Sequence, residues 1–362
     1  MKILIATNHS YMLWQFRREL IAALLERGHQ VMVSTPFVGH QKDLEGLGCR
    51  CVETAVDRRG VNLLRDLGLC MAYRRLLAAE DPDLVLTYSI KPNIYAGFLC
   101  RLRGVPYCAN VQGLGTAFQS KGLAELVTLM YRVALKGART VFFENQSNAA
   151  LFRQRNVLNA ARQTVLPGAG VNLERYGFRP CPDHGEQVRL LYLGRIMREK
   201  GVDELFWAVR RLRETYGGRV VLALVGFFED EYREQVETLV QEGAAVFYGF
   251  QEDPRPFYAD ADCVVLPSYH EGMSNVLLEA AATGRPVVTS DIPGCREAVE
   301  DGTTGYLCRV MNREDLYHKL DAFVRLPLEE RAEMGRRARA KMERDFDKQT
   351  VVDATLRGIL GD

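Results

Sequence analysis

Two short segments in the second half of the chain place glycines and charged residues directly after apolar runs. The first, residues 194–201, follows the run 190–193 and carries Gly194, Arg195 and Lys200 before a helical pattern. The glycine permits a tight turn, and cations beside the free N–H groups of a helix N-terminus favour an anion. The pattern predicts a diphosphate-binding loop, although a basic loop before a helix also occurs on ordinary surfaces.

The second segment follows the run 263–266 and contains two carboxylates, Glu271 and Glu279, eight positions apart. A carboxylate accepts hydrogen bonds from adjacent hydroxyls, which suits a sugar or a ribose. Glu279 falls in an apolar helical pattern, where an unpaired carboxylate is costly, so we favour a binding role over a solvated helix position. The intervening loop offers backbone amides that could bind an anion, those of Gly272, Met273, Ser274 and Asn275.

The elements that must position these residues alternate along the whole chain. The predicted strands are 3–7, 31–34, 84–88, 107–111, 141–143, 190–193, 220–225, 245–248, 263–266 and 287–289. Helical spacing of apolar residues is found in 14–27, 202–213, 231–242 and 275–283. Such βαβ alternation predicts an α/β protein with doubly wound parallel sheets, whose ligands bind at the carboxyl ends of the strands.

The alternation is interrupted once, around the Pro- and Gly-rich segment 167–186. We therefore predict an N-terminal Rossmann-like domain over 1–175, a second over 180–345, and a cleft between them that holds the site. The helical pattern of 328–360 continues to the end, and we expect 346–362 to return to the first domain.

The composition is that of a soluble, two-domain enzyme. Of 362 residues, 47% are hydrophobic and 26% charged, and no apolar stretch reaches the ~18–20 residues of a membrane span. The first residues do not form a secretory signal, so we expect a cytoplasmic protein. The nine cysteines lack the spacing of a zinc site. The Asp-x-Asp strings at 81–83 and 260–262 precede strands, so we expect turns there and no metal. We also expect no nucleic-acid partner.

The two charged segments together resemble a known family. GR-x4-KG at 194–201, followed by PS-x2-EG-x6-EA-x3-G-x-PVV at 267–288, is similar to the retaining glycosyltransferases of family 4, which have the GT-B fold. The spacing of the two glutamates matches that family's E-x7-E signature. SIKPNIYAG at 89–97 and VQGLG at 111–115 resemble the branch that builds lipid-linked bacterial saccharides, the precursors of capsule, O-antigen and N-glycans.

The resemblance implies a role for each residue of the second domain. Arg195 and Lys200 would hold the diphosphate of a UDP-sugar donor. Glu271 would contact the donor sugar, Glu279 the ribose hydroxyls, and the turn that contains Phe250 would border the base. It also implies sugar transfer with retention, without a metal or any cofactor beyond the donor substrate.

The first domain departs from the family pattern, because no histidine follows the strand 107–111. Gln112 and His9 are the candidates for the missing sugar contact. A UDP-sugar epimerase and a non-catalytic sugar-binding protein are the alternatives. A dinucleotide-dependent oxidoreductase would need G-x-G-x-x-G after the first strand, where this chain has no glycine.

Charge is divided unevenly between the halves of the chain. Residues 1–180 contain 23 Lys and Arg against 13 Asp and Glu, a net charge of +10, and the remainder carries −9. This asymmetry indicates either that the N-terminal half contacts something anionic or a chance surface composition with attraction between the two halves. Together with the resemblance to the branch that builds lipid-linked saccharides, it leads us to expect attachment to the anionic inner face of the cytoplasmic membrane and a polyprenyl-diphosphate-linked saccharide acceptor. The first candidate surface covers 58–77, where Arg58, Arg59, Arg65, Arg74 and Arg75 interleave with Val61, Leu63, Leu64, Leu67, Leu69 and Met71.

The second candidate surface covers 118–136. For it we expect packing on the sheet to account for most of the apolar residues, namely Leu123, Leu126, Leu129 and Met130. Ordinary amphipathic helices and a soluble acceptor are the alternative to membrane attachment for both surfaces.

Overall fold

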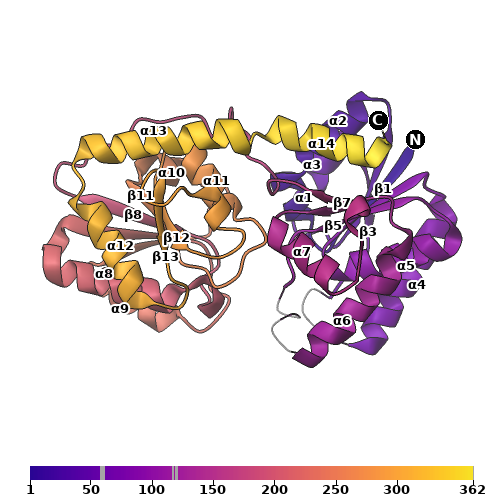
Figure 1. The fold of residues 1–362 in the computed structure, drawn as a ribbon, viewed down its shortest axis with the longest axis horizontal. Coiled ribbons are helices and arrows are strands. Elements are labelled where there is room, and N and C mark those ends of the chain that lie inside the picture. Colours follow the sequence, from indigo (N-terminus) through magenta and orange to yellow (C-terminus); the bar gives the residue numbers. More distant parts are fainter. Residues whose placement is uncertain (58–61, 116–117, 119–120, 362) are drawn as a thin grey trace. The chain divides into compact units, whose positions relative to one another are not determined.

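The computed structural model describes residues 1–57, 62–115, 118 and 121–361 and divides the chain into two compact units (Figure 1). Unit 1 comprises Met1–Ala169 and Gln349–Asp362, and unit 2 comprises Gly170–Lys348. The change of unit therefore falls at the Pro-Gly-Ala-Gly sequence of 167–170. The irregular segment that follows it belongs to unit 2.

Unit 1 is built on a seven-stranded parallel sheet of order β3-β2-β1-β4-β5-β6-β7. Its strands are β1 (Lys2–Ala6), β2 (Gln30–Thr35), β3 (Arg50–Glu53), β4 (Leu84–Tyr88), β5 (Tyr107–Val111), β6 (Val141–Phe143) and β7 (Gln163–Val165). Its helices are α1 (Ser10–Phe16), α2 (Arg18–Glu26), α3 (Gln41–Gly46), α4 (Leu63–Glu80), α5 (Ile90–Arg103), α6 (Lys121–Ala134), α7 (Gln146–Gln154) and α14 (Lys348–Leu360).

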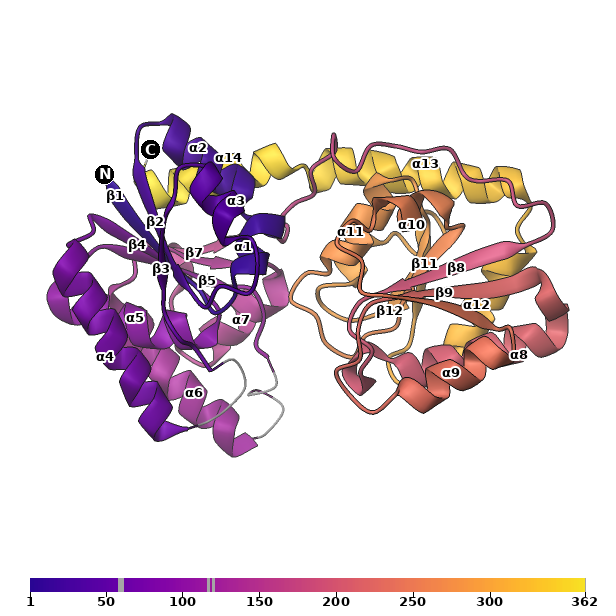
Figure 2. The same cartoon turned by 180° about the vertical axis from the view of Figure 1, so that it is seen from behind.

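The two faces of this sheet bury separate hydrophobic cores. Successive side chains of a strand point to opposite faces, so Ile3 and Ile5 join one core while Leu4 and Ala6 join the other. Helices α1, α2, α3 and α14 cover the first face, and α4, α5 and α6 cover the second (Figure 2). Strands buried on both faces explain the continuous apolar runs of the sequence.

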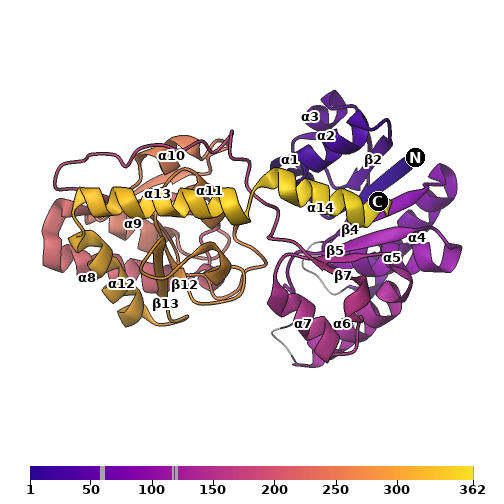
Figure 3. The same ribbon diagram turned by 45° about the horizontal axis from the view of Figure 1, so that its top comes forward.

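The last helix, α14, packs closely within unit 1 (Figure 3). The Thr140 hydroxyl donates to the Gly358 carbonyl at 3.0 Å. A Cβ atom at Gly358 would lie 2.6 Å from the Phe142 ring, so a larger residue would push the helix away from the sheet. The helical pattern of 328–360 is divided at Phe346 and Asp347, between a helix of unit 2 and α14.

Unit 2 is built on a six-stranded parallel sheet of order β10-β9-β8-β11-β12-β13. Its strands are β8 (Val188–Leu193), β9 (Val220–Val225), β10 (Ala245–Gly249), β11 (Cys263–Leu266), β12 (Val287–Ser290) and β13 (Gly305–Cys308). Its helices are α8 (Val202–Tyr216), α9 (Arg233–Gln241), α10 (Arg255–Asp260), α11 (Asn275–Ala282), α12 (Arg313–Arg325) and α13 (Leu328–Asp345).

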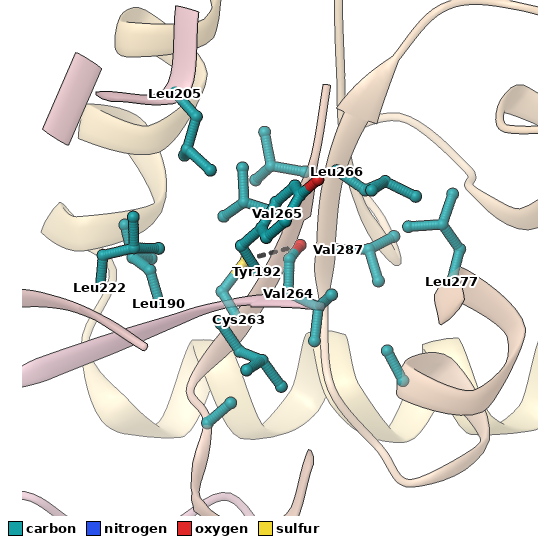
Figure 4. Close-up of a cluster of buried hydrophobic side chains, with 14 of the residues drawn as sticks. Leu190, Tyr192, Leu205, Leu222, Cys263, Val264, Val265, Leu266, Leu277 and Val287 are labelled. Atoms are coloured by element: carbon teal, nitrogen blue, oxygen red, sulfur yellow. Dashed lines mark hydrogen bonds between the residues drawn. The ribbon is translucent and has the colours of Figure 1, made fainter. Parts of the chain in front are cut away.

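The core of unit 2 lies around its two central strands. Leu190 and Tyr192 of β8 pack with Cys263 and Val265 of β11, between helix side chains such as Leu277 (Figure 4). The chain reverses direction across the sheet between β8 and β11, and ligands of doubly wound sheets bind at the carboxyl ends of the strands beside such a switch point.

The structure corrects one predicted helix. The pattern 14–27 is not a single helix, because α1 ends at Phe16 and α2 begins at Arg18. Arg17 is buried at this break, where its Nη2 donates to Glu144 Oε1 at 2.6 Å. A fixed position for this guanidinium accounts for the interruption, and spacing of apolar residues cannot reveal it.

Among the residues that the structure describes, none of the helices combines the length and the apolar character that crossing a membrane requires.

Candidate active site

The two charged loops of unit 2 are neighbours in space, at the carboxyl ends of the adjacent strands β8 and β11. Residues 194–201 leave β8, and residues 267–274 leave β11. Their backbones touch at Gly201, which has φ +69°, and a Cβ atom there would lie 2.1 Å from the Pro267 carbonyl oxygen. Only glycine permits this approach, which explains the glycine of the first loop.

A second pair of glycines allows the loops after β8 and β9 to approach one another. Gly226 has φ +151°, and a Cβ atom there would lie 1.8 Å from the Gly194 carbonyl oxygen. The predicted tight turn at Gly194 therefore lies where the carboxyl ends of the neighbouring strands β9, β8 and β11 meet.

The ammonium of Lys200 and the carboxylate of Glu271 face each other across the two loops. Lys200 Nζ lies 2.5 Å from Glu271 Oε1, and both side chains are mostly buried. The Ser268 hydroxyl donates to the same oxygen at 2.8 Å. A partly buried pair of this kind is held in a defined geometry, and its ammonium lies where a diphosphate could compete for it.

Tyr269 fastens the second loop to the first. Its N–H donates to the Glu199 carbonyl at 2.9 Å, and its hydroxyl lies 2.8 Å from both carboxylate oxygens of Glu204, in the first turn of α8. Sequence reasoning missed this pairing, because the two residues are 65 positions apart and neither belongs to a recognised motif.

Arg195 points towards the loop after β9. Its Nη1 lies 3.3 Å from Glu229 Oε2, and its backbone carbonyl accepts from the buried Tyr192 hydroxyl at 2.5 Å. The expectation that Arg195 and Lys200 both flank a helix N-terminus is correct only for Lys200. Lys200 ends a short 3-10 turn directly before α8, whereas Arg195 lies at the other end of the same loop, next to β8.

Glu279 lies in the second turn of α11 and is surrounded by tyrosines. The Tyr258 hydroxyl of α10 donates to Oε2 at 2.9 Å, and Tyr176 lies close enough to hydrogen-bond as well. Burial raises the pKa of Glu279 to about 7, although both tyrosines and the charges of Lys348 and Arg175 act in the opposite direction. The carboxyl is therefore half protonated near neutral pH in the ligand-free protein.

Two aromatic rings mark the ends of β9 and β10. Phe250, which was predicted to border a base, is largely exposed, and its ring meets Phe227 edge-on at 6.2 Å between centroids. Exposed aromatic faces of this kind can stack on a planar heterocycle. Phe227 was not predicted, although its place directly after Gly226 at a strand end is a signal that could have found it.

The loop amides of 272–275 do not all remain available for an anion. The N–H of Ser274 donates to the Gly294 carbonyl at 2.9 Å, so this amide already has a partner within the protein. The Met273 side chain is buried in the core. Asn275 begins α11, and Gly294 is fixed against Gly272 because a Cβ atom would lie 2.5 Å from the Gly272 carbonyl oxygen.

The carboxyl edge of the unit 1 sheet has its own switch point, between β1 and β4. Ser89 directly follows β4 with φ +72° and ψ 159°, a conformation that is strained for any residue except glycine. Its hydroxyl donates to Asn8 Oδ1 at 2.8 Å. Strain at the ligand edge of a sheet is typical of functional sites. Ser89 begins the motif at 89–97, but the sequence did not predict a site role for it or for Asn8.

The two predicted residues of unit 1 also lie at this edge. Gln112 directly follows β5 and is partly buried. His9 is the N-cap of α1, where Nδ1 accepts from the Tyr11 N–H at 3.2 Å. This contact gives His9 a structural role and fixes the tautomer, since an accepting Nδ1 carries no proton.

The Asp-x-Asp strings lie at the amino ends of the strands. Asp83 Oδ2 accepts from the Lys2 N–H at 2.6 Å, and Asp262 Oδ2 accepts from the Arg189 N–H at 2.8 Å. Within the described ranges, no group of three or more His, Cys, Asp and Glu residues is arranged as metal ligands.

Comparison with known proteins agrees with this architecture. Residues 181–341 match the model of the family "Glycosyl transferases group 1", and residues 13–169 match "Glycosyl transferase 4-like domain". The chain belongs to the family 4 glycosyltransferases of the GT-B fold.

Two bacterial glycosyltransferases are similar to this glycosyltransferase over most of their length. It is 27% identical over 327 residues, 85% of each chain, to the N,N'-diacetylbacillosaminyl-diphospho-undecaprenol alpha-1,3-N-acetylgalactosaminyltransferase of Campylobacter jejuni. It is 26% identical over 94% of each chain to the lipopolysaccharide core biosynthesis glycosyltransferase LpsE of Rhizobium meliloti. The structure of Anabaena Alr3699/HepE in complex with UDP and glucose superposes with a TM-score of 0.81 at 19% identity over the full length of both chains.

Proposed function

We propose that this glycosyltransferase moves a hexose or N-acetylhexosamine from a UDP-sugar to a lipid-linked saccharide, with retention at the anomeric carbon. The observation that supports it best is the meeting of Lys200 and Glu271 at the switch point of unit 2. Arg195 and Glu279 lie on loops or helices that leave the same edge of the sheet. The complexes of Alr3699/HepE with UDP and the acceptor in the name of the Campylobacter relative support the donor and acceptor classes.

In this proposal Lys200 and Arg195 stabilise the charge that develops on the departing diphosphate. The Lys200 ammonium replaces its contact with Glu271 by a contact with a phosphate oxygen. Arg195 can likewise replace its 3.3 Å contact with Glu229 by a contact with the diphosphate. Glu271, freed from the ammonium, accepts hydrogen bonds from hydroxyls of the donor sugar. Glu279 accepts the ribose hydroxyls, and Phe227 and Phe250 flank the base.

Retention follows from attack on the same face of the sugar that the leaving group departs from. The acceptor hydroxyl forms a bond to the anomeric carbon, the bond to the β-phosphate oxygen breaks, and the phosphate takes the hydroxyl proton. We expect no metal ion and no further cofactor, since Arg195 and Lys200 of the first loop and the N-terminus of α8 supply the positive charge.

The acceptor proposal draws on an exposed stripe along α4 of unit 1. Leu64, Leu67 and Met71 are 81%, 61% and 53% exposed, and Arg74 and Arg75 are exposed one turn further on. Spacings of three and four residues put them on one side of the helix. Arg58 and Arg59 of the predicted surface lie outside the described residues, so the stripe rests on Arg65, Arg74 and Arg75.

The helix α6 adds a second exposed stripe. Leu126 and Leu129 are about half exposed, whereas Leu123 and Met130 pack against the core. Packing on the sheet thus accounts for only two of the four apolar residues, and the expectation that it explains most of them was wrong. We propose that both stripes rest on an anionic membrane surface that carries the acceptor.

The test is an assay of the purified chain with a UDP-sugar and an undecaprenyl-diphosphate-linked saccharide. We expect UDP release that requires the acceptor and a glycosidic product with the donor's anomeric configuration by NMR. Conversion of the UDP-sugar without acceptor would identify an epimerase instead. Equal transfer to a water-soluble saccharide would favour the soluble-acceptor alternative.

A further inference from the structure

Unit 2 contains a pocket of about 470 Å³ at the opposite edge of its sheet from the donor loops. His184, Gln187, Arg219 and Asp262, which line it, all lie just before the strands β8, β9 and β11 begin. Parallel strands present their amino ends at this edge, so the pocket cannot serve the loops that leave their carboxyl ends. Its volume is in the range of small-molecule sites.

Arginines from three parts of the chain reach this pocket. Arg219 donates its Nε to the Glu186 carbonyl at 3.2 Å and lies over the Tyr216 ring, and within the described residues it forms no salt bridge with a carboxylate. Arg325 donates its Nε to the Tyr216 hydroxyl at 3.0 Å and lies 3.0 Å from Asp321 Oδ2. Two exposed guanidinium groups therefore flank the same tyrosine.

The floor of the pocket is also basic. Arg331 is buried, donates to the carbonyls of Val324 and Leu326 at 3.0 Å each, and reaches Asp262 only at 3.5 Å. Arg285 does not line the pocket but interacts electrostatically with Asp262, which does; it is fully buried, and its Nε and Nη1 have no hydrogen-bond partner in the described part of the chain. Unpaired N–H groups of a buried guanidinium are costly and favour an anion nearby.

The carboxylates near the floor do not balance these cations. Asp262 is the buried acid between Arg331 and Arg285, and burial raises its pKa in spite of both arginines. Arg285 keeps its remaining Nη2 contacts with the Arg179 and Pro180 carbonyls, which are neutral. Glu186 also lines the pocket, so three arginines face two acids and the lining carries a formal charge of +1.

The walls are apolar. Val324, Leu326 and Pro327 line one side, and Pro182 lines another. An inorganic ion alone would leave this surface unused, whereas an organic anion would cover it. We propose that the pocket binds a small organic anion, a carboxylate or a phosphate ester, with its charged group between Arg219 and Arg331 and its apolar part on Val324 and Leu326.

Such a ligand would join two segments that are distant in the sequence. Residues 182–187 lead into β8, and residues 324–331 connect α12 to α13. A bound anion would hold these segments together, so both should gain protection from hydrogen exchange on binding. The site is independent of the donor loops, and its occupation does not require the proposed transfer reaction.

The experiment is a calorimetric titration with glycerol 3-phosphate, butyrate and orthophosphate, carried out with and without excess UDP. Glycerol 3-phosphate and butyrate distinguish a phosphate ester from a carboxylate, and orthophosphate reports binding of charge alone. We expect saturable binding of one of the two organic anions that persists when UDP fills the donor loops. Hydrogen exchange should slow in 182–187 and 324–331.

Two arginine substitutions test the assignment. Arg219→Ala should weaken binding roughly tenfold or more, because it removes a charge-assisted hydrogen bond. Arg336→Ala, which removes an exposed arginine of α13 outside the pocket, should leave it unchanged. Arg219 is exposed, and an unchanged melting temperature without ligand would show that the variant is folded. Absence of saturable binding by every probe, or equal affinity in Arg219→Ala, would overturn the proposal.

Discussion

Lys200 Nζ and Glu271 Oε1 lie 2.5 Å apart although the two residues are separated by 71 positions. The contact joins a loop that carries positive charge to a loop that carries a sugar-binding carboxylate. In the ligand-free protein each group therefore neutralises the other. A donor must replace this contact with two of its own, one to its diphosphate and one to its sugar hydroxyls.

Removal of either donor-loop cation should reduce turnover while leaving the protein folded. We expect Lys200→Ala and Arg195→Ala each to lower kcat by roughly 10²–10³, the usual cost of losing one group that stabilises transition-state charge. Steady-state kinetics measure this. Arg211→Ala, at an exposed position of α8 paired with Glu214, is the matched control. Near-normal turnover in both site variants would move the donor diphosphate elsewhere.

Substitutions of Glu271 and Glu279 should differ in their effects on UDP affinity and on the rate of transfer. Glu279→Gln should mainly weaken the affinity for free UDP, because the ribose hydroxyls lose a carboxylate. Glu271→Gln should instead slow transfer with little change in UDP affinity, since UDP lacks the donor sugar that Glu271 is proposed to contact. Calorimetric titration of UDP into both variants, followed by rate measurements, tests the assignment. The opposite pattern would mean that the two roles are exchanged.

The raised pKa of Glu279 predicts that UDP binding depends on pH. Ribose hydroxyls donate to the ionised carboxylate, so affinity should be greatest above about pH 7 and fall by up to about tenfold per pH unit below it. The phosphates of UDP also change protonation with pH. The pH profile of UDP affinity measured for Glu279→Gln is therefore subtracted from that of the unaltered protein. If the two profiles coincide, Glu279 does not contact the nucleotide as a carboxylate.

The same pKa makes a prediction for stability. The folded protein holds the proton up to about pH 7, whereas the unfolded chain releases it near 4.5. The free energy of unfolding should therefore fall as pH rises from about 4.5 to about 7 and level off above. Glu279→Gln should lack this component of the decline. Urea denaturation of unit 2 across this range, followed for both proteins, measures the difference.

The positions of the site loops could be predicted from the sequence, but the contacts that hold them could not. The glycines and charged residues of 194–201 are close together in the sequence and follow a strand, so this loop could be recognised from neighbouring residues alone. Tyr258 and Tyr176 reach Glu279 from other elements, and Ser89 meets Asn8 across 81 positions. Such pairs form only when the sheet assembles, and a single sequence carries no sign of them.

The same distinction applies to the fold. Strands buried on both faces, such as β5 and β9, give long apolar runs, and their predicted bounds match the structure. The missed strands β3, β7 and β13 lie at sheet edges and are three or four residues long, and β3 and β7 also carry polar side chains. Edge strands are held by pairing on one side only, so their sequences need no continuous apolar run.

Tyr269 should act as a positioning residue rather than a catalytic one. Tyr269→Phe keeps the ring but removes the hydroxyl contacts with Glu204, so the loop that carries Glu271 should be held less firmly. We expect kcat to fall by about tenfold, with a smaller change in UDP affinity. Tyr216→Phe removes a similar hydroxyl contact, to Asp321, at the opposite edge of the sheet, and is the control. Equal effects of the two variants would indicate a purely structural role.

Membrane attachment should depend on the exposed stripe of α4. Lys91 Nζ lies 2.6 Å from Asp66 Oδ1, which fixes this helix on α5 and keeps its outer side in a constant orientation. Each basic residue near an anionic leaflet contributes about 1 kcal/mol, so replacing Arg74 and Arg75 by alanine should weaken vesicle binding roughly thirtyfold. Flotation with anionic and neutral vesicles measures this, and binding to the anionic vesicles should disappear at high salt.

The control for this experiment is a pair of arginines in unit 2. Arg336 and Arg337 are also adjacent and exposed on a helix, so their replacement removes the same charge from a different surface. We expect that variant to float as the unaltered protein does. Replacing Leu64 and Leu67 by serine should weaken attachment at every salt concentration, because the lost contribution is hydrophobic rather than electrostatic. If the unaltered protein does not float with anionic vesicles at low salt, the stripe does not bind membranes and a soluble acceptor is the better hypothesis.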